Sequence, residues 1–399
     1  MVPTKAPASR SLLQRGLLIA GIVLLALNLR PALASVGPLV GAIRDATGLS
    51  NVALGLLTTL PLLAFGALST LTPLVTRRLG TEGALAGALV LIGLGTLVRA
   101  LPSVALLFGG TVLLGVGIAA GNVLLPALVK RDFPEHSGAL TSLYSSAMGA
   151  GAAGAAGVTV PLAGALGWRW ALGVWAVPAV AALVVWLPQL TGRRVMPSRR
   201  SIGASLRSLG RSALAWQVAL YMGLQSFTFY VVLAWLPDLL QARGLGPAEA
   251  GWMLALAQAV GIAGSAVVPL WAARRRDQRP VVWTLAGLEA AGLGGLFLPG
   301  ASLTALWVSL VGFIGGGTFG LALLFLVVCT PDSETATALS GMAQSVGYLI
   351  AAVGPALVGF LHDLTGGWTV PLLLLTATMG AKALAGLQAG RPDQIRPGG

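Results

Sequence analysis

Apolar residues recur in long runs along almost the whole chain, separated by short polar segments. A run of about 20 apolar residues is long enough for an α-helix to cross the roughly 30 Å hydrocarbon core of a bilayer. The pattern therefore predicts an all-α membrane protein. We expect twelve transmembrane helices, at about 16–36, 51–76, 83–101, 104–129, 138–164, 168–188, 213–236, 247–273, 280–298, 303–329, 336–361 and 368–388.

Three features of the first half of the chain return in the second half at offsets of 196 to 200 residues. They are a basic stretch, a segment of small and polar residues, and a Gly-Trp pair, at 73–78 and 269–275, at 139–146 and 338–345, and at 167–168 and 367–368. The repetition predicts two six-helix pseudo-repeats with a solute site between them near mid-membrane. We divide the chain into an N-terminal bundle (1–190), a basic cytoplasmic linker (191–212) and a C-terminal bundle (213–399).

The composition excludes a soluble protein, since 56% of the residues are hydrophobic and only 9% are charged. The net charge of +13 follows from loop positions rather than from binding to nucleic acid. We place 20 of the 25 Lys and Arg residues on the side of the termini, and the exceptions are Arg30, Arg44, Arg99, Arg169 and Arg243. This bias puts both termini in the cytoplasm. We expect the protein in the inner membrane. The expected partners are the lipid bilayer and a small-molecule solute, and we expect a monomer.

One arginine interrupts the first apolar run, in the segment Asn28-Leu29-Arg30-Pro31. A cationic side chain at mid-depth costs about 2.5–3.5 kcal/mol on insertion scales, so it normally faces a polar cavity. Pro31 removes a backbone hydrogen bond and bends the helix beside the charge. Asn28 should point elsewhere, toward a neighbouring helix. We interpret Arg30 as the contact for an anion or strongly polar solute; the alternative is an internal salt bridge that only holds helices together.

Three stretches, at 27–32, 122–134 and 339–348, resemble the cyanate/nitroimidazole permease family (CynX/NimT) of the major facilitator superfamily. The resemblance runs over essentially all twelve helices. It implies the major facilitator fold and transport of small anionic or compact polar compounds, or efflux of nitroaromatic compounds.

The loop after helix 2 departs from the superfamily pattern Gly-x-x-x-Asp-Arg-x-Gly-Arg-Lys, because Arg77 stands at the acidic position. Acidic residues of the neighbouring loops could pair with the arginines of this loop and of its repeat. Their alternative role is favourable negative charge near the N-termini of helices 5 and 11. The expected cytoplasmic gate charges are Arg77, Arg78, Asp132, Arg274, Arg275 and Asp332.

Polar residues on the predicted helices supply the other site candidates. Gln344 and Tyr348 are four residues apart and therefore share a helix face. Helices 1, 4, 5, 7, 10 and 11 line the cavity in the fold that the resemblance implies, and nearly all of these polar residues fall on them. The proposed substrate-binding residues are Arg30, Asn122, Tyr144, Gln225, Tyr230, Gln344 and Tyr348. The alternative for each residue is a hydrogen bond between helices, worth under about 2 kcal/mol.

Glu289 lies midway along the ninth predicted helix, and we take it as the other charge within the bilayer. A buried carboxyl is a candidate carrier of a coupled proton. The implied fold puts this helix at the periphery, however, which favours a structural role. His136 and His362 have no second ligand-type neighbour and Cys329 is the single cysteine, so we expect no metal and no cofactor.

The leading hypothesis is a secondary active transporter that moves a small anionic or compact polar solute by alternating access, with a cyanate-like or nitrate-like anion favoured. The alternative is proton-coupled efflux of nitroimidazole-like or other compact aromatic compounds. A membrane receptor or enzyme is a distant alternative, because an enzyme should show paired catalytic groups within the bilayer. The chain also carries no nucleotide-binding loop, which argues against ATP-driven transport.

Overall fold

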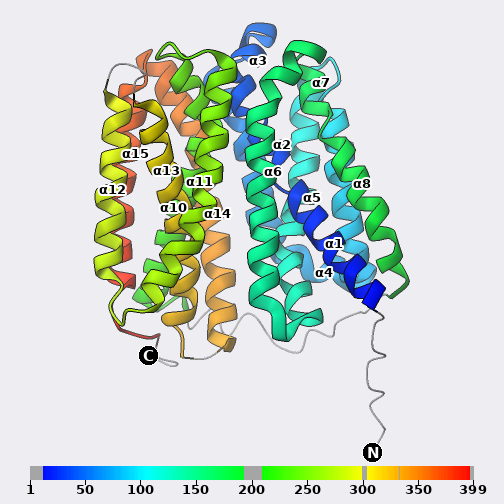
Figure 1. Cartoon of the computed structure of the whole chain (residues 1–399), viewed down its shortest axis with the longest axis vertical. Coiled ribbons are helices and arrows are strands. Elements are labelled where there is room, and N and C mark those ends of the chain that lie inside the picture. Colours follow the sequence, from blue (N-terminus) through cyan, green and yellow to red (C-terminus); the bar gives the residue numbers. More distant parts are fainter. Residues whose placement is uncertain (1–11, 193–208, 299–302, 332, 396–399) are drawn as a thin grey trace, which may run out of the picture.

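The computed structural model describes residues 12–192, 209–298, 303–331 and 333–395, and these residues form helices and turns without a strand. Figure 1 shows two helical bundles side by side. The N-terminal bundle contains α1 (Leu12–Asn28), α2 (Pro31–Ala34), η1 (Gly37–Leu39), α3 (Val40–Thr47), α4 (Asn51–Val98), α5 (Val104–Asp132), η2 (Pro134–His136), α6 (Ser137–Leu166), α7 (Trp168–Gly173), α8 (Ala176–Trp186) and η3 (Leu187–Gly192). The C-terminal bundle contains α10 (Ala213–Gln241), α11 (Pro247–Ala273), α12 (Arg279–Phe297), α13 (Thr304–Val328), α14 (Ser333–Thr365) and α15 (Thr369–Ala389).

The first predicted helix is broken rather than bent. The α1 helix ends at Asn28, and α2 begins at Pro31, whose missing N–H is no loss at the first position of a helix. The carbonyl of Arg30 accepts the backbone N–H groups of Leu33 and Ala34, each at 3.0 Å, and so starts the new helix. The prediction of one continuous helix over 16–36 is therefore wrong, and Arg30 lies at the break.

The break predicted between the helices at 51–76 and 83–101 is confirmed. It falls inside the element α4, where Gly80 takes a φ of 72° and separates two helical segments without a longer loop. The predicted helix 168–188, by contrast, is divided into α7 and α8. The described residues still hold eleven helical segments long and apolar enough to span a membrane, plus the shorter apolar helix Asn51–Gly66. Of the predicted linker 191–212, residues 193–208 lie outside the described part of the chain.

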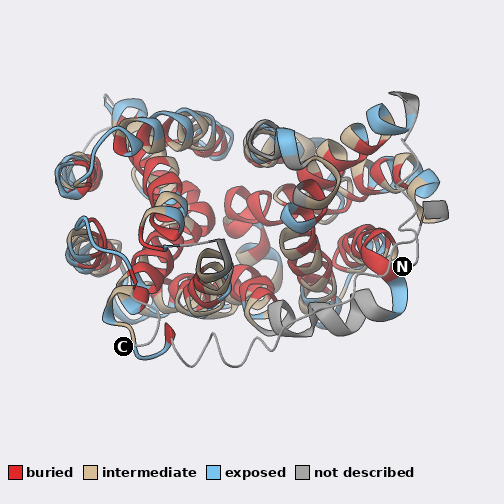
Figure 2. Cartoon of the chain, turned by 90° about the horizontal axis from the view of Figure 1, so that it is seen from below, coloured by how far each residue is buried: buried red, intermediate tan, exposed pale blue. Residues whose placement is uncertain are grey.

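The outer faces of the bundles are apolar. Figure 2 shows buried residues gathered inside the bundles and exposed residues on their outer faces. Large apolar side chains there are more than 60% exposed: Val177, Leu270, Trp283, Val327 and Leu384. Exposed apolar surface of this extent suits contact with lipid rather than water. The protein is therefore a multi-pass membrane protein.

The two bundles contact each other through α4 against α14 and through α6 against α11. We call the end of the molecule where α1 begins and α15 ends the termini end, and the opposite end the far end (Figure 1). Glycines bring the bundles together toward the far end. A Cβ added at Gly37 would lie 2.5 Å from the carbonyl oxygen of Leu233, so only glycine permits this approach. The bundles are thus held closely enough to enclose a space between them.

Candidate functional site

A cavity of about 260 Å³ lies between the two bundles. Its lining includes residues of α5 and α6 from the N-terminal bundle and of α10 to α15 from the C-terminal bundle, together with Arg30 at the helix break. All seven residues proposed from the sequence as substrate contacts line it: Arg30, Asn122, Tyr144, Gln225, Tyr230, Gln344 and Tyr348. The structure therefore brings together residues that are up to 318 positions apart in the chain.

Arg30 lies against an aromatic wall of the cavity. Its Nη1 donates a hydrogen bond to the Tyr230 hydroxyl at 3.0 Å. Its guanidinium carbon lies 5.2 Å from the ring centre of Phe229 and 5.7 Å from that of Tyr230, within the range of cation–π attraction. The two rings meet edge to face at 5.1 Å. These contacts hold the guanidinium in place without neutralising its charge.

The helix break that carries Arg30 is fixed by neighbouring helices. Arg99, which is 1% exposed, donates to the carbonyl of Ala32 in α2 at 2.6 Å and so anchors the segment after the break. On the other side of the break, Asn28 donates to the carbonyl of Pro178 in α8 at 3.1 Å. This contact confirms the prediction that Asn28 points toward a neighbouring helix. Arg30 is thereby left to face the cavity.

Phenols and amides complete the polar lining. Tyr144, Tyr230 and Tyr348 line the same cavity as Arg30, so three phenol groups share it with the arginine. The Gln344 side chain donates to Ser340 at 3.0 Å, and the Gln225 side chain donates to Ser226 at 2.7 Å. These groups can both donate and accept hydrogen bonds. The cavity can therefore replace part of the water shell of a polar solute while offering it aromatic faces.

The α12 helix lies at the periphery of its bundle, as expected, since it packs chiefly against α13 and α15. Glu289 nevertheless lines the cavity, and it is not the only other charge in the membrane region. Lys382 in the middle of α15 donates to Glu289 Oε1 at 2.7 Å, and both residues are 3% exposed and line the cavity. The prediction that Lys382 belongs with the basic residues on the side of the termini is therefore wrong. The signal for the correct placement was available, because a lysine inside an apolar helix indicates a buried polar site.

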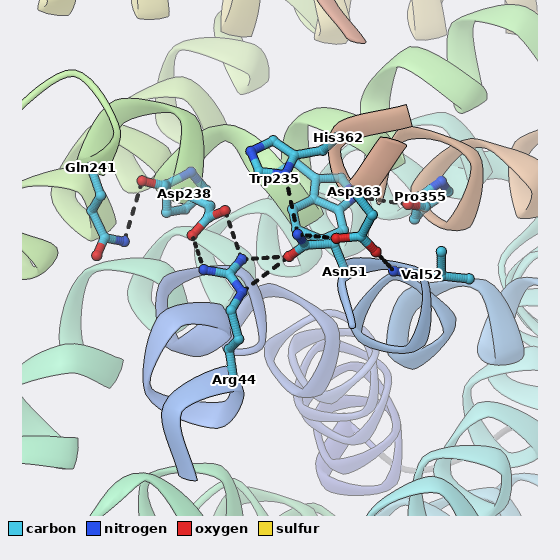
Figure 3. Close-up of polar contacts among 10 residues, drawn as sticks. Arg44, Asn51, Val52, Trp235, Asp238, Gln241, Pro355, His362 and Asp363 are labelled. Carbon is cyan, nitrogen blue, oxygen red and sulfur yellow. Dashed lines mark hydrogen bonds and ion pairs between the residues drawn. The ribbon is translucent and has the colours of Figure 1, made fainter. Parts of the chain in front are cut away.

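A polar cluster joins the bundles at the far end (Figure 3). We define the far-end cluster as Arg44, Asn51, Asp238, His362 and Asp363. The Arg44 guanidinium forms an ion pair with Asp238 at 2.9 Å and donates to Asn51 Oδ1 at 2.6 Å. Asn51 in turn donates to Asp363 Oδ1 at 2.6 Å and lies 3.1 Å from His362 Nδ1. The gate charges predicted from the sequence all belong to the termini end, and this cluster was not among them.

The gate charges expected at the termini end are arranged differently from the prediction. Arg131 pairs with Glu82 at 2.6 Å and with Asp132 at 2.8 Å. Burial opposes the charge of Arg131, but its hydrogen bonds to Asp132 and Glu82 outweigh that effect and raise its pKa above the ordinary value. Glu82, which is 1% exposed, thus supplies a buried carboxylate at the loop where the superfamily pattern has its aspartate.

The remaining expected gate residues form no common site in the part of the chain that the structure describes. Arg78 and Arg274 are exposed, and the Arg275 guanidinium lies 5.4 Å from the ring centre of Trp271. The side chain of Arg77 and the whole of Asp332 lie outside the described residues.

Comparison with known proteins gives consistent matches. The family described as Major Facilitator Superfamily matches residues 17–355. The 2-nitroimidazole transporter of Escherichia coli is 44% identical over 384 residues, covering 96% of this chain and 97% of its own. The cyanate transport protein CynX of Escherichia coli is 32% identical over 349 residues, covering 87% of this chain and 90% of its own. The crystal structure of a D-xylose-proton symporter superposes with a TM-score of 0.75 at 17% identity, over 94% of this chain and 96% of that one, and shows the same fold.

Proposed function

This chain belongs to the CynX/NimT family of the major facilitator superfamily and is a transporter rather than an enzyme, and from that premise we propose that it carries a compact planar anion built on a single ring. The transported compound would present to Arg30 the oxygens of a carboxylate, or of a nitro group on an ionised ring. The other six contacts would be Asn122, Tyr144, Gln225, Tyr230, Gln344 and Tyr348.

The observation that supports the proposal most strongly is that Arg30 lines the cavity with its charge uncompensated among the described residues. Its partners are a phenol oxygen and two ring faces, and among the described residues no carboxylate lies within ion-pair distance of it. A guanidinium presents its donors in a planar fork that matches two oxygens on one planar group. Phe229 and the tyrosines offer faces against which a single ring can stack. Charge and shape therefore favour the same class of solute.

A triatomic anion such as cyanate is the second candidate, and the relative that transports cyanate favours it. Cavity size argues against it as the best fit. An anion of that size displaces about two water molecules, each with about 30 Å³ of liquid volume, and so would fill only a minor part of about 260 Å³. A single ring with one substituent uses more of the space and more of the aromatic wall.

We further propose that the protein is a monomer of the inner membrane with its termini in the cytoplasm. The basic residues support this orientation, because Arg78, Arg131 and 274–276 all belong to the termini end. The far-end cluster would then hold the bundles together on the external side. In alternating access, the contacts of this cluster would break when the loops at the termini end come together. Arg77, Arg78, Asp132, Arg274, Arg275 and Asp332 remain the proposed charges for that closure.

The test is thermal stabilisation of the purified protein by 4-hydroxybenzoate, 2-nitroimidazole, cyanate and nitrate. A ligand at about 100 times its dissociation constant stabilises by about 2.7 kcal/mol. The two ring compounds should raise the melting temperature at lower concentration than cyanate or nitrate. Arg30→Lys should remove most of the effect, because an ammonium group lacks the two-pronged geometry. Stabilisation by cyanate or nitrate alone would overturn the ring assignment.

A further inference from the structure

The ion pair between Glu289 and Lys382 is a second charged site in the same cavity. Its atoms are 2.7 Å apart, and the side chains are 5% and 4% exposed. Removing two charges from water costs several kcal/mol for each ion, so a buried pair is a poor source of net stability. Ionisable residues inside membrane proteins more often mark pathways for ions and protons. The pair therefore calls for a role other than holding α12 against α15.

We propose that Glu289 is a proton-binding site coupled to the solute through Lys382. The proposal rests on the proposed function, because it requires an anionic solute in the cavity. When the anion arrives, its oxygens compete with Glu289 for the ammonium group of Lys382. The released carboxylate has lost its counter-charge in a dry site and takes a proton from water in the cavity, forming a neutral carboxyl. Only a proton is transferred, and no electrons move.

The charges in the cavity give the sign of the coupling. Among the described residues that line it, Arg30 and Lys382 are positive and Glu289 is negative, which leaves one net positive charge. A monovalent anion alone neutralises that charge, and a proton alone doubles it. Anion and proton together restore the original value. Each ligand therefore favours binding of the other, and by linkage the effect is reciprocal.

The surroundings of Glu289 leave Lys382 as the charge that controls it. The α13 helix, which packs against α12, carries no titratable residue, and α15 carries only Lys382. From α10, Tyr221 interacts electrostatically with Glu289. The other charged residues of α11 and α12 lie in first turns, at Glu249 and Arg279. Solute and Glu289 therefore compete for one cation.

The test uses the full-length protein in proteoliposomes with 4-hydroxybenzoate as the probe. A pH gradient should drive accumulation by wild type up to about tenfold per pH unit, the limit for one proton per monovalent anion. Glu289→Gln should lose this accumulation and its pH dependence but keep the exchange of internal for external 4-hydroxybenzoate, because Arg30 is intact. Glu289→Asp, which can still bind a proton, should retain accumulation. Asp277→Asn, at an exposed ion pair outside the cavity, is the control and should behave as wild type.

A second measurement does not depend on the folding of a variant. Addition of 4-hydroxybenzoate to wild-type protein in weak buffer with a pH indicator should cause uptake of protons from solution. Exchange without proton uptake, or gradient-driven accumulation by Glu289→Gln, would overturn the coupling proposal and leave the proposed function standing. Absence of both binding and exchange in wild type would overturn the proposed function, and the coupling proposal with it.

Discussion

The cavity holds two cationic side chains whose surroundings differ. Arg30, from the N-terminal bundle, is held by a phenol and two ring faces, and no carboxylate of the described residues compensates it. Lys382, from the C-terminal bundle, is compensated by Glu289. An unpaired charge in a low-dielectric site acts on a solute far more strongly than a neutralised pair. The comparison assigns attraction of the solute to Arg30 and leaves Lys382 available only when Glu289 is neutral.

The largest expected effect follows from removing the unpaired charge. Arg30→Ala should weaken 4-hydroxybenzoate binding by about 4 kcal/mol, about 1000-fold, as expected for truncating one partner of a buried charge pair. The free energy of unfolding should stay the same or rise, because the substitution leaves no carboxylate without its partner. Calorimetric titration and denaturation of the same preparation measure both quantities. A strong loss of stability would show that Arg30 has a structural partner and would weaken the contrast with Lys382.

Removing the paired charge should give the opposite pattern. Lys382→Met leaves Glu289 buried without its partner and should lower the free energy of unfolding by about 3 kcal/mol at pH 8. The loss should be smaller at pH 5, because protonation of the carboxyl removes the uncompensated charge. The double variant Lys382→Met/Glu289→Leu is the matched control and should recover most of the stability. A single variant as stable as wild type at both pH values would mean that the pair is not buried in the working protein.

The far-end cluster contains a third kind of charge, an ion pair that is partly exposed to solvent. The side chains of Arg44 and Asp238 are 33% and 11% exposed, so solvent screens their attraction. Asp238→Asn should cost the far-end-closed conformation about 1 kcal/mol, about a fivefold change in its population. Distances between spin labels on α3 and α14 would measure the change. An unaltered distance distribution would show that this cluster does not control the equilibrium between the far-end-closed and far-end-open conformations.

The exposed pair at Asp277 should show the smallest effect. Hydrogen bonds from the Arg279 side chain and backbone hold the pKa of Asp277 below its usual range. A lowered pKa in the folded state gives stability that is present above the unfolded-state pKa and lost as the pH falls through the folded-state pKa. Asp277→Asn should therefore melt slightly below wild type at pH 7, and the difference should disappear as the pH falls through the lowered pKa of Asp277. Equal melting temperatures at pH 7 would place this pair's contribution at zero.

The sequence was sufficient for most of the spanning helices and for seven residues that line the cavity from both bundles. Twenty-residue apolar runs specify spanning helices whatever they pack against, and Arg30 beside Pro31 stands out as a charge at a weak point of a helix. The spacing of Gln344 and Tyr348 also follows from helix geometry alone. These inferences depend on local physics, so they needed no knowledge of tertiary contacts.

Contacts between distant helices could not be predicted in the same way. Pairing of Glu289 with Lys382 joins residues 93 positions apart, and the contact of Arg44 with Asp238 spans 194 positions. Neither separation is set by a helical period. Tertiary packing decided each case.

The central claim is that Arg30 contacts the carboxylate of the solute. Its most direct test removes the charge from the protein and from the solute, separately and together. Binding of 4-hydroxybenzoate and of its uncharged analogue 4-hydroxybenzyl alcohol should be measured with wild type and with Arg30→Ala. If Arg30 contacts the carboxylate, the substitution should greatly weaken binding of the acid and leave binding of the alcohol nearly unchanged, so the two changes are not additive. Equal losses for both compounds, or no binding of the acid by wild type, would contradict the account.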